Sequence, residues 1–223
     1  MAEQGGDGVG ECPMRFMLSL LLCFIIVCPA FAVPRREMLF DVTLDMDADG
    51  KLDRAVLVLV GPGRNTTWEL SRGIYPLSAN ETVDLAIYLG GGGEPIDISK
   101  PPTILKQNII DREYAAWVQS LDVVNKHSLK VGWNEQPGSS HDLEEVLTIA
   151  WRKGQFLVVG LDTFWENPNG IGNCQLNLST GEGSRADGEL PAPKPTFKAK
   201  VKPVPLEKWS AKTWPTQCDQ IVE

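Results

Sequence analysis

Residues 40–60 of the chain read FDVTLDMDADGKLDRAVLVLV, and this stretch decides the fold that we expect. Residues 40–44 alternate between apolar and polar types, and residues 55–60 form a run of β-branched and other apolar side chains. Both patterns are typical of β-strands. Residues 45–53, which are rich in aspartate, lie between these two segments, so the sequence predicts a strand-loop-strand connection.

The acidic loop carries aspartates at relative positions 1, 3, 5 and 9, namely Asp45, Asp47, Asp49 and Asp53. Four carboxylates converge without strong mutual repulsion only when a hard cation takes their oxygens. Gly50 allows the sharp turn that convergence needs, and Lys51 would offer its backbone carbonyl. We therefore predict a Ca²⁺ site with these four side chains and the Lys51 carbonyl as metal ligands.

The loop is not an EF-hand, because its position 12 is Val56 rather than a bidentate glutamate, and strand-like segments flank it. Asp/Gly-rich turns also occur without metal, since both residue types suit turn geometry. Four aspartates in this register favour the metal. No coordination position is evidently left open, so we expect a structural ion.

The pattern Asp-x-Asp-x-Asp-Gly-x-x-Asp, followed by residues 54–57, resembles the calcium loop of FG-GAP/VCBS-type repeats, which form the blades of integrin-like β-propellers. Residues 128–131, 147–160 and 174–181 resemble segments of small uncharacterised bacterial periplasmic proteins that carry one such loop. The resemblance implies calcium, export and antiparallel sheets of the propeller type. It implies no substrate.

An almost unbroken apolar run covers residues 16–28, and the small-x-small sequence Ala30-Phe31-Ala32 follows it. This pattern predicts a secretory signal peptide, removed after Ala32, and a periplasmic or secreted protein. Residues 1–13 are acidic and glycine-rich, so we expect translation to start at Met14. The run is shorter than the roughly 20 residues that span a bilayer, so we expect no stable membrane insertion.

Removal of residues 1–32 would leave 191 residues (223 − 32), enough for one domain with a sizeable core. Its net charge would be −6, from 20 basic and 26 acidic residues, and no basic cluster compensates, which argues against nucleic acid as a partner. We expect a β-rich calcium-binding domain over residues 33–186. An extended Pro/Lys-rich tail follows over residues 187–223, where alternating prolines disfavour helix and central strand.

Of the five cysteines, three lie in the predicted leader, which leaves Cys174 and Cys218. In an oxidising compartment these two are expected to form a disulfide that pins the tail. Two reduced thiols, or a thiol site, are the alternative.

Further strands are expected at residues 83–89, 128–133, 145–151, 155–161 and 172–178. Arg152-Lys153-Gly154 predicts a hairpin turn, and the four glycines at residues 90–93 predict a flexible turn rather than a phosphate cradle. Helical spacing suggests one short helix through Ile110, Tyr114, Trp117, Val118 and Leu121. The predicted fold is mostly β, with antiparallel sheets and at most one short helix.

Catalytic motifs are not evident. The histidines are His127 and His141, and the run Ser139-Ser140-His141-Asp142 does not predict a triad, because sequence neighbours seldom adopt that geometry. We expect a binding or interaction module with an unknown protein or glycan ligand. The alternative is a small secreted hydrolase or glycan-active enzyme, which would need a cleft with convergent titratable groups away from the acidic loop.

Overall fold

The computed structural model of the chain describes residues 34–62, 75–110, 116–135, 142–168, 170–188 and 195–210, together with Pro215 and Cys218. These residues belong to one compact unit, Pro34–Glu223. The predicted leader, with its cleavage site and start at Met14, lies outside the described residues, as do Tyr114 and the run 139–141.

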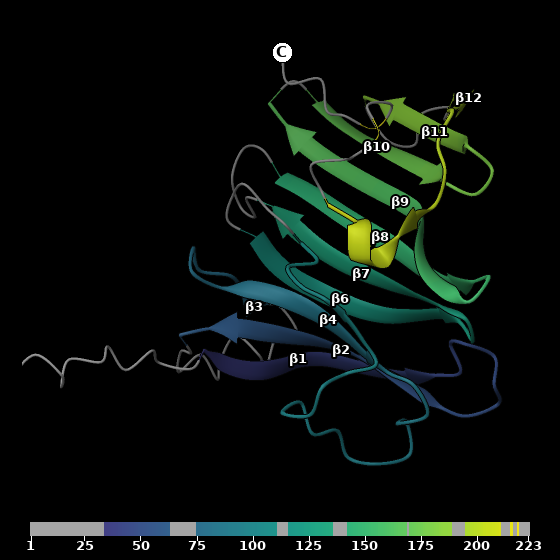
Figure 1. Cartoon of the computed structure of the whole chain (residues 1–223). Helices are drawn as coiled ribbons and strands as arrows, with labels where there is room; N and C mark the ends of the chain where they lie inside the picture. The colour runs from purple at the N-terminus through teal and green to yellow at the C-terminus, as the bar shows by residue number, and fades with distance from the viewer. Residues whose placement is uncertain are drawn as a thin grey trace, which may run out of the picture. The chain divides into compact units, whose positions relative to one another are not determined.

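The described strands form two sheets in which every pairing is antiparallel, which confirms the predicted fold class (Figure 1). The smaller sheet has the order β1-β2-β4-β5, with β1 (Arg35–Leu44), β2 (Asp53–Gly61), β4 (Thr82–Tyr88) and β5 (Ile104–Lys106). The larger sheet has the order β12-β11-β10-β9-β8-β7-β6-β3, and β13 also pairs with β9. Its strands are β3 (Tyr75–Pro76), β6 (Ala116–Asn125), β7 (Ser128–Glu135), β8 (Asp142–Arg152), β9 (Gln155–Asn167), β10 (Gly170–Asn177), β11 (Glu182–Asp187), β12 (Thr196–Lys198) and β13 (Val204–Pro205).

One hydrophobic core joins the inner faces of the two sheets. Alternate residues of β2 and β4, such as Leu57 and Leu85, meet alternate residues of the larger sheet, such as Trp133 and Leu147, and all four are fully buried. This alternation is the period of two that a strand imposes on its side chains.

The outer face of the smaller sheet is also covered. Val56, Val58 and Ala86 are fully buried there, and Ile96 and Ile98 from the segment after β4 pack against them. Burial on both faces explains why β2 is a continuous apolar run rather than an alternating one.

The predicted helix is wrong in the described residues, because β6 covers residues 116–125. The pairing of β6 with β7 shifts register between Val118 and Ser120, so Gln119 is an extra residue in the strand. This bulge places the buried Val118 and Leu121 three positions apart. The bulge in the strand therefore gave these apolar residues the spacing that is typical of a helix.

The hairpin between β8 and β9 is confirmed. Arg152 pairs with Gln155, and the two residues between them, Lys153 and Gly154, have φ angles of 54° and 80°. Positive φ at both central residues is the requirement of a type I′ turn, whose twist matches the flanking strands.

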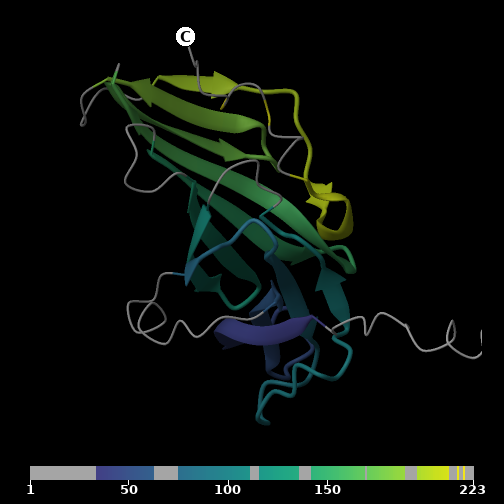
Figure 2. The same ribbon diagram turned by 90° about the vertical axis from the view of Figure 1, so that its left-hand side faces the viewer.

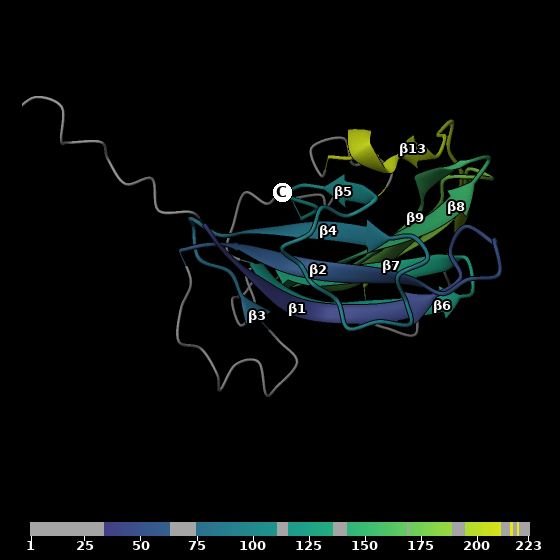
Figure 3. The same cartoon turned by 60° about the horizontal axis from the view of Figure 1, so that its bottom comes forward.

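The C-terminal segment runs along the larger sheet (Figure 2). Strand β12 pairs with β11, and β13 pairs with β9 at Leu157 and Val158. Next comes a single 3-10 turn, η1 (Leu206–Lys208), which lies beside β5 (Figure 3). The predicted disulfide is present: Cys174 of β10 is bonded to Cys218, with an S–S distance of 2.02 Å.

Candidate metal site

The acidic loop joins the two strands that were predicted to flank it. Leu44, the last residue of β1, pairs with Asp53, the first residue of β2. Ala48 and Gly50 have φ angles of 65° and 83°, so the backbone enters the left-handed region twice within the loop. Such a conformation favours glycine and disfavours most other residues, which accounts for Gly50 in the predicted turn.

Short-range hydrogen bonds fold the loop onto its own carboxylates. The backbone N–H of Asp49 donates to Asp47 Oδ1 at 3.1 Å, and the backbone N–H of Lys51 donates to Asp49 Oδ1 at 2.8 Å. Each is an Asx-turn contact, in which an aspartate accepts from the residue two positions later.

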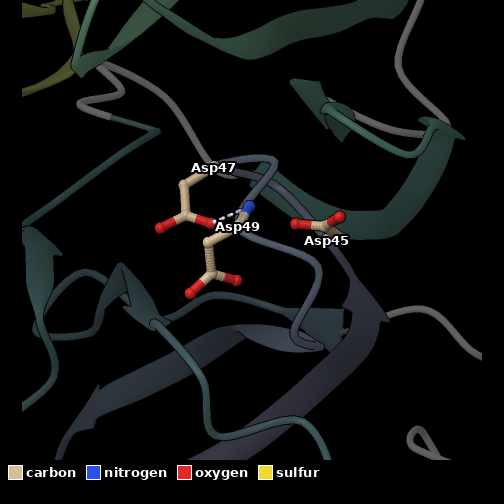
Figure 4. Close-up of side chains that lie close together, drawn as sticks. All are labelled: Asp45, Asp47 and Asp49. Carbon is tan, nitrogen blue, oxygen red and sulfur yellow. Dashed lines mark hydrogen bonds between the residues drawn. The ribbon is translucent and has the colours of Figure 1, made fainter.

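Three of the predicted ligands come together in this turn. One carboxylate oxygen each from Asp45, Asp47 and Asp49 lies within 4.8 Å of the others, and we call this cluster the acidic triad (Figure 4). Asp45 and Asp47 are partly buried and Asp49 is exposed. Asp45 Oδ1 is buried and has no hydrogen-bond partner among the described residues. The triad could hold a metal ion, which would satisfy that oxygen.

The side chain of Lys51 occupies one edge of the triad. Its Nζ lies 3.1 Å from Asp49 Oδ2. The backbone N–H of Lys51, followed by its ammonium group, lowers the pKa of Asp49, and the hydrogen bond to Asp49 raises the pKa of Lys51. The exposed ammonium therefore offsets part of the negative charge of the triad. Coordination through the Lys51 carbonyl stays a prediction.

Asp53 lies outside the triad and has a different set of partners. Its Oδ2 accepts hydrogen bonds from the backbone N–H groups of Met46 at 2.7 Å and Asp47 at 3.4 Å. Its Oδ1 accepts a hydrogen bond from the backbone N–H of Gly90 at 2.8 Å. Asp53 is fully buried. Its carboxylate closes the loop and fastens it to the end of β4.

The glycines at residues 90–93 form part of the loop's surroundings, which the sequence reasoning missed. The backbone N–H of Gly92 donates to the Leu52 carbonyl at 2.8 Å. A Cβ at Gly92 would lie 2.6 Å from Leu52 Cβ and 2.8 Å from its backbone, so no side chain fits. The four glycines after a strand were the available signal, but their spacing did not indicate the acidic loop as their contact.

His127 is the second neighbour that was missed. It lies in the turn between β6 and β7, and its Nδ1 is 2.7 Å from the Asp45 carbonyl oxygen. The backbone N–H of His127 donates to Asn125 Oδ1 at 2.9 Å, which fixes the turn. This contact joins the acidic loop of the smaller sheet to the larger sheet.

The partners of Asp53 predict a large effect of replacing it. Asp53→Asn keeps the shape of the side chain but replaces one acceptor oxygen by an N–H₂ group, so at least one buried backbone N–H loses its partner. We expect the free energy of unfolding, measured by urea denaturation in EDTA, to fall by about 2–3 kcal/mol. The matched variant Asp49→Asn, at an exposed position, should change it by less than about 0.5 kcal/mol. Equal midpoints for the two variants would contradict this role of Asp53.

Comparison with protein-family models, with curated proteins and with solved structures finds no match for this chain. The resemblance to calcium-loop repeats therefore stays a hypothesis that rests on the residues quoted above. Among the described residues, no helix has the length and apolar character to span a bilayer.

Proposed function

We propose that the chain is a periplasmic or secreted calcium-binding β domain that acts as a binding or interaction module, with a structural ion in the acidic loop. The observation that carries the proposal is the acidic triad, in which Asp45 presents a buried oxygen that has no hydrogen-bond partner in the described part of the chain. The loop that holds it connects two strands of the core.

The donor set favours calcium over other metals. All three side chains offer carboxylate oxygen, which suits hard cations, whereas zinc and copper sites commonly include histidine or cysteine. Magnesium demands a near-ideal octahedron, while calcium accepts irregular arrangements of oxygens with varied coordination numbers.

The position of the loop supports a structural role for the ion. Leu44 and Met46, on either side of Asp45, are both buried in the core, and Met46 is fully buried. An ion held by Asp45 would therefore restrain the backbone where the core begins. The disulfide supports an oxidising compartment, because such bonds persist outside the cytosol.

The experiment is thermal unfolding with calcium or with EDTA. Sites in extracellular modules bind calcium with a Kd of about 10⁻⁴–10⁻³ M, so millimolar calcium should raise the free energy of unfolding by about 0.5–1.5 kcal/mol. For a domain of this size, that is an increase in Tm of a few degrees.

Asp45→Asn should abolish the calcium-dependent shift in Tm. The matched control is Asp122→Asn, an exposed aspartate in β6 outside the loop, which should keep the shift. Identical melting temperatures in calcium and in EDTA, together with no heat of calcium binding in calorimetry, would refute the proposal.

A further inference from the structure

The larger sheet carries a groove of about 710 Å³ on the face turned away from the core. Along β8, Leu147 and Ile149 are buried in the core, so Thr148 between them points to the opposite face, and so does Asp162 next to the buried Leu161 of β9. The groove crosses five strands, β7 to β11, and is lined by Lys130, Thr148, Arg152, Val159, Gly160, Asp162, Gln175, Leu176, Asn177, Ser179, Glu182, Gly183 and Ser184. Its volume is in the range of ligand sites, about 300–1,000 Å³.

Small residues in the centre of the sheet create the hollow. Gly160 of β9 pairs with Thr148 of β8 on one side and with Asn177 of β10 on the other. A Cβ at Gly160 would lie 3.2 Å from both Cβ and Oγ1 of Thr148, so a side chain at this position would crowd Thr148. Lys130 pairs with Thr148 and so lies at one end of this row, and Gln175 pairs with Asp162 in a neighbouring row.

The charges in the groove are balanced. Lys130 Nζ forms an ion pair with Asp162 Oδ2 at 2.8 Å, and the remaining charged side chains are Arg152 and Glu182, one of each sign. A polyanion such as nucleic acid, or a strongly cationic peptide, would meet equal attraction and repulsion here. The groove therefore favours a neutral ligand.

Amides and hydroxyls supply the remaining polar groups. Gln175 is exposed, and its side chain forms no hydrogen bond with another described residue. Asn177 Oδ1 accepts the backbone N–H groups of Ser179 and Thr180 at 2.8 and 3.2 Å, which leaves its N–H₂ group as a donor. Thr148 and Ser184 add hydroxyls, which both donate and accept.

A second depression, of about 250 Å³, continues the groove along β9 and shares Asp162 and Gln175 with it. It adds the partly exposed ring of Phe164, the side chain of Asn173 and a further carboxylate, that of Glu144. Asn173 Oδ1 is buried and lacks a hydrogen-bond partner within the described part of the chain. We call the two depressions together the outer trough.

We propose that the outer trough binds a neutral oligosaccharide chain. The described lining carries charges of both signs, with Asp162, Glu182 and Glu144 against Lys130 and Arg152, so it has no strong net charge. The mixture of donors and acceptors, and one aromatic ring beside amides and carboxylates, suit a ligand rich in hydroxyls with weakly apolar ring faces. An extended peptide fits less well, because peptides that add to sheets bind at strand edges, whereas the main-chain groups of β8 and β9 are paired on both sides here. This inference rests on the proposed function only in taking the domain to be a binding module, and it does not require calcium.

The test is a titration of the full chain with a panel of neutral hexasaccharides: cellohexaose, xylohexaose, mannohexaose, maltohexaose and chitohexaose. Calorimetry or NMR chemical-shift changes should detect saturable binding of at least one of them. Gln175→Ala should weaken that binding about threefold to tenfold, since it removes a hydrogen-bonding side chain. Ser184→Leu, which places an apolar side chain in the trough, should weaken it at least as much.

The matched control is Gln155→Ala, an exposed glutamine outside the lining of the trough, which should leave binding unchanged. All variants should keep the Tm of the parent protein within about 2 °C, as surface substitutions usually do. No binding of any hexasaccharide at millimolar concentration would overturn the inference. The inference would also fail if Gln175→Ala and Ser184→Leu bound the hexasaccharide as tightly as the parent protein does. Tighter binding of heparin hexasaccharide or of hexalysine than of the neutral panel would overturn it too.

The result can be separated from that of the calcium proposal. Hexasaccharide binding, with no effect of calcium on Tm and no heat of calcium binding, would support the outer trough and refute the calcium site. A calcium-dependent Tm without hexasaccharide binding would support the calcium site and refute the outer trough.

Discussion

Removing the disulfide between Cys174 and Cys218 is expected to lower the free energy of unfolding by about 4 kcal/mol. The bond joins residues 44 positions apart, and a closed loop of that length restricts the unfolded chain by an amount that chain entropy puts near 4 kcal/mol. In a domain of this size the corresponding decrease in Tm is about 8–16 °C.

The segment that the disulfide closes is packed into the folded protein. Leu206 and Trp209, in the segment that the bond closes, are each only 2% exposed and belong to the core. Lys106 of β5 donates a hydrogen bond to the Trp209 carbonyl, so the segment also contacts the smaller sheet. Without the bond, the unfolded chain gains entropy while these contacts in the folded state stay the same.

Calorimetry of the full chain with and without reductant measures the effect. A double variant, Cys174→Ala with Cys218→Ala, should melt at the temperature of the reduced parent protein and should not respond to reductant. A parent protein that melts within about 2 °C in both conditions would contradict the prediction.

Strands with strong local patterns could be predicted from the sequence. The continuous apolar run in β2 and the Lys153-Gly154 turn each constrain the backbone locally, so neighbouring residues carried enough information. The bulge at Gln119 depends instead on how β6 pairs with β7, which is a contact between strands that periodicity within one segment does not contain.

In the acidic loop, too, the local features could be predicted from the sequence and the long-range contacts could not. The spacing of Asp45, Asp47 and Asp49 indicated that their carboxylates converge, because a turn brings together residues two apart. The bond from Gly90 to Asp53 and the contact of His127 with the Asp45 carbonyl span 37 and 82 residues of the chain, and no local pattern encodes them. The spacing therefore predicted Asp53 as a metal ligand, but it did not indicate the hydrogen bonds that Asp53 accepts in the folded chain.

Glu145 was overlooked for a related reason, because a single glutamate in a strand pattern gives no sign of its burial. It lies on the core face of β8 and is only 9% exposed. Burial raises its pKa to about 8, the carboxyl group of Glu135 adds to the increase, and the hydrogen bond from Trp133 Nε1, at 2.8 Å, opposes it. Below that pKa the side chain is neutral in the folded protein, while in the unfolded chain it ionises near its ordinary value of 4.5.

We expect Glu145 to make the protein less stable as the pH rises from about 4.5 to 8. In this window the folded state binds more protons at Glu145 than the unfolded state does, so the free energy of unfolding falls with increasing pH. Glu145→Gln keeps an acceptor for Trp133 Nε1 and removes the titration. Each unit of pKa difference corresponds to about 1.4 kcal/mol, and partial access of water reduces the total, so we expect the variant to be more stable than the parent by about 2–4 kcal/mol at pH 8.5 and nearly equal to it at pH 4.5.

Urea denaturation across this pH range measures the difference. Glu166→Gln is the matched control: Glu166 is an exposed carboxyl group on β9, so the variant should retain the pH dependence of the parent. If Glu145→Gln loses as much stability between pH 4.5 and pH 8.5 as the parent protein does, the buried carboxyl group of Glu145 is not the source of that loss.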